Sequence, residues 1–324
     1  MAKIVGSLEP EDDYTHPLGP EPTFNESMYF NFFDRRAAIG GFVRIGNRAN
    51  EGYAETTVTL FMPDGRVLFR FARPEIPNND AMDAGGLRFD VIEPTQKLRT
   101  VFEGTTVELR EPRDMADPRV ALAENPRKQV AIDLVHDAVG PMYGNNVGDS
   151  ALPVEQQFAK GHFEQHMHVS GRLEIDGEAL AFEGYGMRDH SWGPRVWQAI
   201  DGYEWLTMNF GPDLGAMLSS IRRTGQEASV GGVVVRGDEL ENVREVAIEA
   251  DYEANGLYHT AVRARFRTQS GEELSVTGSV RGFIPLRNRR DGRVTHIGEG
   301  MTEWRLGDRV GYGLSEFLRQ VPAA

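Results

Sequence analysis

The chain consists largely of short segments in which apolar and polar residues alternate, separated by turns rich in Gly, Asp, Asn and Pro. Tyr53–Phe61 and residues 66–71 flank a Met-Pro-Asp-Gly turn, and Asp-Gly between two such segments is a strong β-hairpin signal. A second Asp-Gly pair, at positions 176 and 177, joins residues 172–175 to residues 180–182. A period of two places alternate side chains on one face of a strand, so these segments predict antiparallel β-structure.

The same alternation of apolar and polar residues continues through the rest of the chain. Further strands are predicted at residues 232–235, 243–248, 261–266, 274–280 and 301–306. Only two short segments, 154–159 and 315–320, suggest helices, and residues 111–128 and 140–153 suggest long loops. Many short strands over this length are typical of β-barrels or sandwiches, so the predicted fold is mainly β.

We predict two domains. The division is placed after the hairpin that precedes a dense cluster of polar residues, giving residues 1–187 with an N-terminal arm and residues 188–324. The segments 111–128 and 140–153 are interpreted as loops within the first domain rather than linkers.

The composition is that of a soluble globular protein, with 40% hydrophobic and 26% charged residues. The net charge of -14 argues against partners that carry phosphates, such as nucleic acids or anionic membranes. The absence of cysteine excludes disulfides and thiolate chemistry. No secretory signal and no apolar run long enough to span a membrane are evident, so we expect a cytoplasmic protein. The sequence is compatible with a homo-oligomer and does not determine the oligomeric state.

Common nucleotide and hydrolase motifs are missing. Gly40-Gly41 lacks the strand-to-helix context of a dinucleotide site, and no phosphate-binding loop ends in Gly-Lys-Ser/Thr. Ser191 does not lie in a Gly-x-Ser-x-Gly elbow. We therefore predict no cofactor and no serine hydrolase.

Residues 184–195, which read GYGMRDHSWGPR, contain most of the candidate catalytic side chains. Their three glycines and one proline predict a shaped loop that follows a strand. A carboxylic acid in an apolar, aromatic pocket has a raised pKa and can donate a proton, which suits Asp189, with His190 as its partner or as a base. On an extended strand these neighbours point to opposite faces, so a direct relay would need a bend. The residues predicted to form the pocket walls are Tyr185, Trp192 and Trp205.

A purely structural interpretation of the same segment stays open. Asp189 would then form a salt bridge with Arg188 or Arg195, while Trp192 would plug one end of a barrel. In that case the segment would shape the fold and carry no chemistry.

A second polar group lies upstream, where His162, Glu164, His166 and His168 share one parity and therefore one strand face. Imidazoles and a carboxylate could bind zinc or iron. However, every second residue of a strand advances about 6.6 Å, so these side chains diverge. We predict no metal site and assign Glu164 and His166 to a polar wall that binds substrate.

The motif at residues 186–193, together with Phe163-Glu164-Gln165 and the Asp176-Gly177 turn, resembles the hydroxyneurosporene synthase (carotenoid 1,2-hydratase)/AttH-like group. The resemblance implies two lipocalin-like (calycin) antiparallel β-barrel domains with an apolar ligand cavity near their junction. Asp189, His190 and Trp192 match the group's Asp-His-x-Trp element. Its downstream Tyr-x-Asp element has only loose counterparts in Tyr203-Glu204-Trp205 and Gly211-Pro212-Asp213.

The resemblance also implies acid-initiated chemistry on polyenes and terpenoids. We therefore predict a cofactor-independent lyase or isomerase, namely a hydratase, dehydratase or cyclase, acting on an isoprenoid, steroid or polyketide-like molecule. The alternative is a non-catalytic carrier of apolar small molecules, because barrels commonly enclose a ligand.

Overall fold

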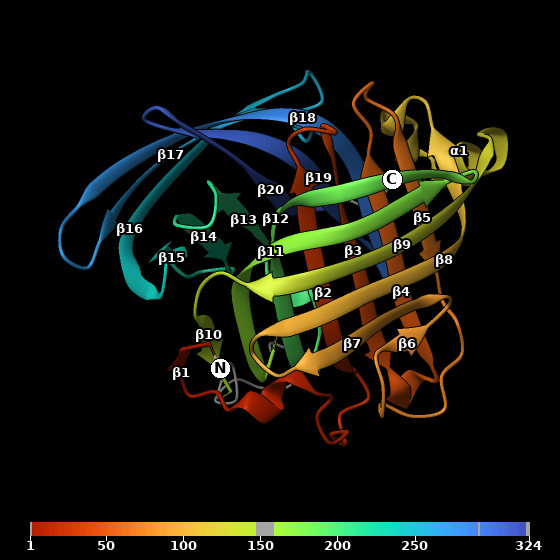
Figure 1. Ribbon diagram of the computed structural model, residues 1–324, viewed down its shortest axis with the longest axis horizontal. Helices are drawn as coiled ribbons and strands as arrows, with labels where there is room; N and C mark the ends of the chain where they lie inside the picture. The colour runs from red at the N-terminus through yellow and green to blue at the C-terminus, as the bar shows by residue number, and fades with distance from the viewer. Residues whose placement is uncertain (1, 147–158, 291, 322–324) are drawn as a thin grey trace. The chain divides into compact units, whose positions relative to one another are not determined.

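The computed structural model describes residues 2–146, 159–290 and 292–321, and its fold is mainly β, which confirms the predicted class (Figure 1). The chain divides into two compact units. The first unit consists of Met1–Leu60, Leu68–Glu108 and Pro126–Val196, and the second of Phe61–Val67, Leu109–Asn125 and Trp197–Ala324. The predicted division after residue 187 falls inside strand β12 (Glu178–Pro194), whose residues all belong to the first unit.

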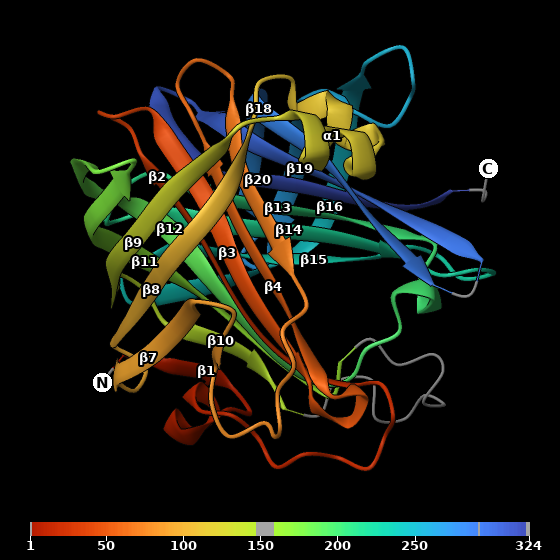
Figure 2. The ribbon, with the colours of Figure 1, turned by 90° about the vertical axis from the view of Figure 1, so that its right-hand side faces the viewer.

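The first unit contains one twelve-stranded sheet. Its strands are β1 (Ile4–Gly6), β2 (Phe24–Asp34), β3 (Ile39–Arg48), β4 (Tyr53–Phe61), β5 (Val67–Ala72), β6 (Asp83–Ala84), β7 (Leu87–Glu93), β8 (Lys97–Leu109), β9 (Arg127–Ala138), β10 (Met142–Asn145), β11 (Gly161–Ile175) and β12. Two 3₁₀ turns lie at Pro10–Asp13 and Ala49–Glu51. Strand β9 pairs with both β8 and β11, so β11, β12, β2, β3, β4, β5, β8 and β9 form a closed circuit (Figure 2).

The hairpin predicted at the Asp176-Gly177 turn is present between β11 and β12, and its strands are longer than the predicted segments 172–175 and 180–182. Its pairing runs from Gly161 opposite Trp192 to Ile175 opposite Glu178. Asp176 and Gly177 at its turn have φ of 51° and 87°, as a two-residue turn that matches the strand twist requires. The hairpin predicted at the Asp64-Gly65 turn is also present, between β4 and β5.

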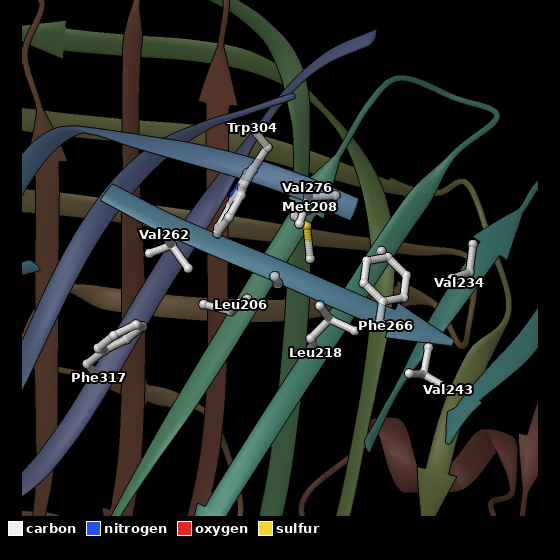
Figure 3. Close-up of a cluster of buried hydrophobic side chains, with 12 residues drawn as sticks. Leu206, Met208, Leu218, Val234, Val243, Val262, Phe266, Val276, Trp304 and Phe317 are labelled. Atoms are coloured by element: carbon white, nitrogen blue, oxygen red, sulfur yellow. The ribbon is translucent and has the colours of Figure 1, made fainter. Parts of the chain in front are cut away.

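The second unit contains a closed antiparallel barrel of eight strands. They are β13 (Gly202–Asn209), β14 (Gly215–Arg222), β15 (Ser229–Arg236), β16 (Glu239–Tyr252), β17 (His259–Thr268), β18 (Glu273–Arg290), β19 (Arg293–Leu306) and β20 (Arg309–Val321). A 3₁₀ turn at Trp197–Ala199 precedes β13. Figure 3 shows one cluster of buried apolar side chains in this unit, among which Trp304, Leu206 and Leu218 are inaccessible to solvent. Burial of this apolar surface is the main force that holds the barrel together.

Four local predictions are wrong. The long loop predicted at residues 140–153 contains strand β10. The shaped loop predicted at residues 184–195 is part of strand β12 as far as Pro194, because it pairs with β11 and β2. Residues 315–320 belong to β20, because barrel pairing overrides a weak helical pattern. Residues 111–128 contain a 3₁₀ turn at Pro112–Ala116 and a helix, α1 (Pro118–Glu124), in place of a plain loop. Asp117 caps this helix by accepting from the Val120 N–H.

The predicted helix at residues 154–159 lies outside the described residues except for its last position. In the described part of the chain, no helix has the length and apolar character needed to cross a bilayer.

Glycines let β12 approach its neighbour β2 closely. A Cβ atom added to Gly186 would lie 1.8 Å from the backbone oxygen of Asn31, and one added to Gly184 would lie 1.9 Å from that of Phe33. The two strands pair antiparallel over Tyr185–Pro194, the segment that carries the predicted chemistry. Gly184 and Gly186 thus hold that segment against β2.

We expect Gly186→Ala to lower the free energy of unfolding by about 1–3 kcal/mol or more, because the new methyl group forces β12 away from β2. Denaturant unfolding followed by circular dichroism measures the change. Gly231→Ala in β15 is the control, because its Cβ meets no atom within 4 Å. Equal midpoints for the two variants would contradict the close approach.

Candidate active site

Alternation along β12 separates the predicted catalytic residues. Arg188, His190 and Trp192 point to the face that packs on the apolar side chains of the first unit, here called the core face. Asp189 points to the opposite face, here called the outer face, and its side chain is 19% exposed. The predicted pairing of Asp189 with His190 as acid and base is therefore wrong, because the segment is an extended strand without the bend that a direct relay requires.

On the outer face, cross-strand register assembles a row of polar side chains. Asp189 is directly opposite Glu164 of β11, which is directly opposite Tyr143 of β10. His162, two residues before Glu164, forms an ion pair with Asp189, and its Nε2 lies 3.8 Å from Glu164 Oε1. We call Tyr143, His162, Glu164 and Asp189 the outer cluster.

The outer cluster contains an imidazole that favours its charged form. Desolvation opposes protonation of His162, but the Asp189 carboxylate outweighs it and raises the pKa of His162 to about 9. Burial, and then the Glu164 carboxylate, raise the pKa of Tyr143 well above its usual value. Tyr143 therefore keeps its proton, and its hydroxyl donates to Met187 Sδ over 3.6 Å. At neutral pH the cluster holds a protonated, 47% exposed His162 side chain beside a carboxylate.

On the core face, His190 belongs to a buried network. Its Nε2 lies 2.6 Å from Glu26 Oε1 of β2, and the same oxygen lies 2.9 Å from Nδ1 of His16. His16 Nε2 in turn lies 3.1 Å from Asp12. We call Asp12, His16, Glu26 and His190 the inner cluster. The ring of Trp192 stacks on His16 with 3.7 Å between centroids.

The charges of the inner cluster depend on its hydrogen bonds. Burial disfavours a charged Glu26, but the hydrogen bonds from His16 and His190 prevail and lower its pKa to about 2. Burial lowers the pKa of His16, whereas Glu26 and Asp12 raise it, and the net shift is upward. Glu26 is therefore a carboxylate throughout the physiological pH range.

The structural interpretation of this segment holds in part. Arg188 pairs with Asp13 on the core face and donates to Gln165 Oε1 over 2.8 and 2.6 Å, while Asp189 pairs with His162 on the outer face. Arg195 donates to the Ser191 hydroxyl over 2.6 Å. Trp192 packs in a buried cluster with Leu8, Phe24, Met142 and Phe163, as expected of a plug.

The remaining predicted residues lie in other places. His166 is buried, and its ring centroid lies 6.5 Å from that of Tyr143. Tyr185 contacts His168 farther along the hairpin, with 5.4 Å between ring centroids. Trp205 is half-buried in β13 and belongs to the second unit. The aromatic pocket expected around Asp189 is thus not formed by Trp192, which points to the core face.

Two groups among the described residues could hold a metal ion, and neither is the histidine row considered in the sequence. They are His162 with Glu164 and Asp189, and His16 with Glu26 and His190. His166 and His168 diverge from His162 along β11, as the strand repeat predicts.

Sequence patterns did not single out Tyr143, His16 or Glu26. Tyr143 lies in a segment predicted as loop, and His16 in a segment assigned to an N-terminal arm. A usable signal existed only for Glu26, a charged residue at an inward-pointing position of an aromatic-rich strand, where an unpaired charge is costly.

A family model described as a domain of unknown function, DUF7064, matches residues 9–321 of the chain. The chain belongs to this family. No curated protein sequence matches it.

Solved structures resemble the DUF7064 chain in fold. The AttH candidate of Nitrosomonas europaea aligns with a TM-score of 0.57 and 13% identity over 100% of both chains. Kievitone hydratase from Nectria haematococca aligns with a TM-score of 0.54 and 11% sequence identity, over 99% of this chain and 97% of the hydratase. CghA aligns with a TM-score of 0.56 and 12% sequence identity, over 94% of this chain and 90% of CghA. The predicted likeness to the AttH-like group is confirmed in fold.

The raised pKa of His162 makes stability depend on pH. Because that pKa is about 9 in the folded chain and 6.5 ordinarily, protonated His162 stabilises the fold. The contribution is complete below pH 6.5 and is lost as the pH rises through 9. Denaturant unfolding of wild type and His162→Gln should therefore give a stability difference that declines between these pH values. A difference that stays constant from pH 6 to 10 would contradict the ion pair.

Proposed function

We propose that this DUF7064 protein is a lyase or isomerase, of the hydratase, dehydratase or cyclase type, that transfers protons on an apolar isoprenoid, steroid or polyketide-like substrate. The observation that carries the proposal is the His162–Asp189 ion pair. Its imidazole is 47% exposed and has a pKa of about 9, so it presents a proton to a substrate at neutral pH.

Proton transfer from His162 accounts for each reaction type. In hydration, the imidazolium proton adds to one carbon of a double bond, whose π electrons form the new C–H bond and leave a carbocation on the other carbon. Water adds to the cation, and the resulting oxonium returns a proton to the neutral imidazole. Dehydration is the reverse. In cyclisation, a second double bond attacks the cation, and the proton lost from the new cation restores His162.

The other members of the outer cluster hold this donor in place. Asp189 stabilises the imidazolium through its ion pair with His162, as a carboxylate does beside a catalytic histidine. Glu164, 3.8 Å from His162 Nε2, supplies a second negative charge that favours the protonated ring. Tyr143, directly opposite Glu164 on β10, stays neutral beside that carboxylate. The proposal therefore moves the proton-donor role from Asp189 to His162. Asp189 takes the partner role that was predicted for His190, which is 1% exposed on the core face.

The fold comparisons support the reaction class. One of the solved structures with this fold is a hydratase by name, kievitone hydratase. Another, CghA, was solved with the small molecule Sch210972. Identities of 11–14% carry no individual residue across, so the roles assigned in this chain rest on its own geometry.

The test uses deuterated water and variants of the outer cluster. Apolar molecules that co-purify with the protein are identified by mass spectrometry and incubated with it, alongside acyclic polyenes and the corresponding tertiary alcohols. We expect solvent deuterium on a product carbon. His162→Gln and Asp189→Asn should each lower kcat by about 10²–10⁴, the usual contribution of a general acid.

His168→Gln is the matched control, because it changes the same residue type on the same face of β11. It should retain wild-type turnover. Full turnover in both folded outer-cluster variants would refute the assigned roles. Tight binding without product or deuterium exchange in the wild type would favour the carrier alternative.

A further inference from the structure

The inner cluster brings together three separate parts of the first unit. His16 lies in the segment before β2, Glu26 in β2, and His190 in β12. Glu26 and His190 are at most 1% exposed, and the His16 side chain is 16% exposed. A charged group that is buried this deeply is costly unless its charge is neutralised.

Three atoms of the inner cluster converge. Nδ1 of His16, one carboxylate oxygen of Glu26 and Nε2 of His190 lie within 4.8 Å of one another. Three donor atoms this close together can all reach one ion at about 2.0–2.2 Å. Two imidazoles and one carboxylate form a set that binds Zn²⁺ or Fe²⁺ in proteins and leaves a coordination position for water.

A second layer of contacts orients these donors. Asp12 lies 3.1 Å from His16 Nε2 and holds a proton on that nitrogen, so an ion would displace the other proton, which Nδ1 donates to Glu26. The other Glu26 oxygen accepts from the His16 backbone N–H over 3.1 Å and from Asn79 Nδ2 over 3.3 Å. The oxygen that faces the two histidines is thus the one left for an ion.

His190 is held by packing rather than by a second hydrogen bond. Its ring lies 5.1 Å from that of Phe163 and 5.5 Å from that of Trp192. Its Nδ1 is buried and has no partner in the described part of the chain. In its 2.6 Å contact with Glu26 Oε1, Nε2 donates a proton to the carboxylate. A metal ion would displace that proton, and the neutral ring would then carry its hydrogen on Nδ1.

The charge balance also favours a cation. Asp12 and Glu26 bring two carboxylates into a cluster whose other members are two imidazoles. With neutral imidazoles, a divalent ion would balance both carboxylates. Because metal binding releases protons from histidine, ion and proton compete for the same ring nitrogens.

We propose that His16, Glu26 and His190 bind one divalent first-row transition-metal ion, Zn²⁺ or Fe²⁺, with Asp12 as the group that orients His16. The ion links the segment before β2 to β2 and β12. It is a structural link on the core face, separate from the outer cluster and independent of the proposed reaction.

The experiment measures metal content and stability, not activity. Full-length protein without a histidine tag is purified without chelator, and its metal content is measured by mass spectrometry. The chelator-treated protein is then titrated with Zn²⁺ and, as a spectroscopic probe, Co²⁺. We expect one equivalent to bind, visible absorption bands typical of Co²⁺ with nitrogen and oxygen ligands, and a rise in melting temperature with metal concentration.

Variants locate the ion. His16→Gln is the main one, since His16 is the least buried ligand, and it should abolish binding of Co²⁺ at one equivalent. Asp12→Asn keeps all three ligands and should weaken binding about 10- to 100-fold. His168→Gln, a histidine outside both clusters, should bind as the wild type does.

Two results would overturn the proposal. One is the absence of stoichiometric metal together with an unchanged melting temperature in Zn²⁺ and Co²⁺. The other is binding that survives His16→Gln but is lost in His162→Gln, which would place the ion at the outer cluster. Circular dichroism of each variant separates loss of a ligand from loss of the fold.

Discussion

The two-residue repeat of β12 is the constraint on which the site depends. Neighbouring side chains on an extended strand leave the sheet on opposite sides, so Asp189 and His190 enter different environments although they are adjacent in the chain. Each then takes a partner from another strand: His162 of β11 for Asp189, and Glu26 of β2 for His190. One short motif thereby contributes to two ionic clusters.

The two clusters differ in access to solvent, and this difference assigns their roles. The outer cluster combines a buried carboxylate and phenol with an exposed imidazolium, an arrangement that can exchange protons with a bound molecule. The inner cluster is closed by Trp192, which stacks on His16, and lies near Arg188, which pairs with Asp13. Its groups hold the segment before β2 in place, because breaking a buried pair leaves an uncompensated charge.

Sequence patterns predicted the parts that depend on local chemistry. The Asp-Gly turn at residues 176 and 177 fixed the register of β11 and β12, and that register placed His162, Glu164 and His166 on one face as the alternation requires. What local patterns cannot supply is the partner from a distant segment. His16 meets His190 across 174 positions, and Tyr143 meets Glu164 only because β10 pairs with β11. The helix predicted at residues 315–320 is wrong for the same reason, because pairing with distant strands in the closed barrel makes this segment part of β20.

The central claim is that Asp189 keeps His162 protonated at neutral pH. Nuclear magnetic resonance of ¹³C-labelled histidine rings, assigned with His162→Gln, measures the titration of His162 directly in wild type and in Asp189→Asn. We expect a pKa near 9 in the wild type and a fall toward 6.5 in the variant. A wild-type value near 6.5, or a value that Asp189→Asn does not change, would contradict it.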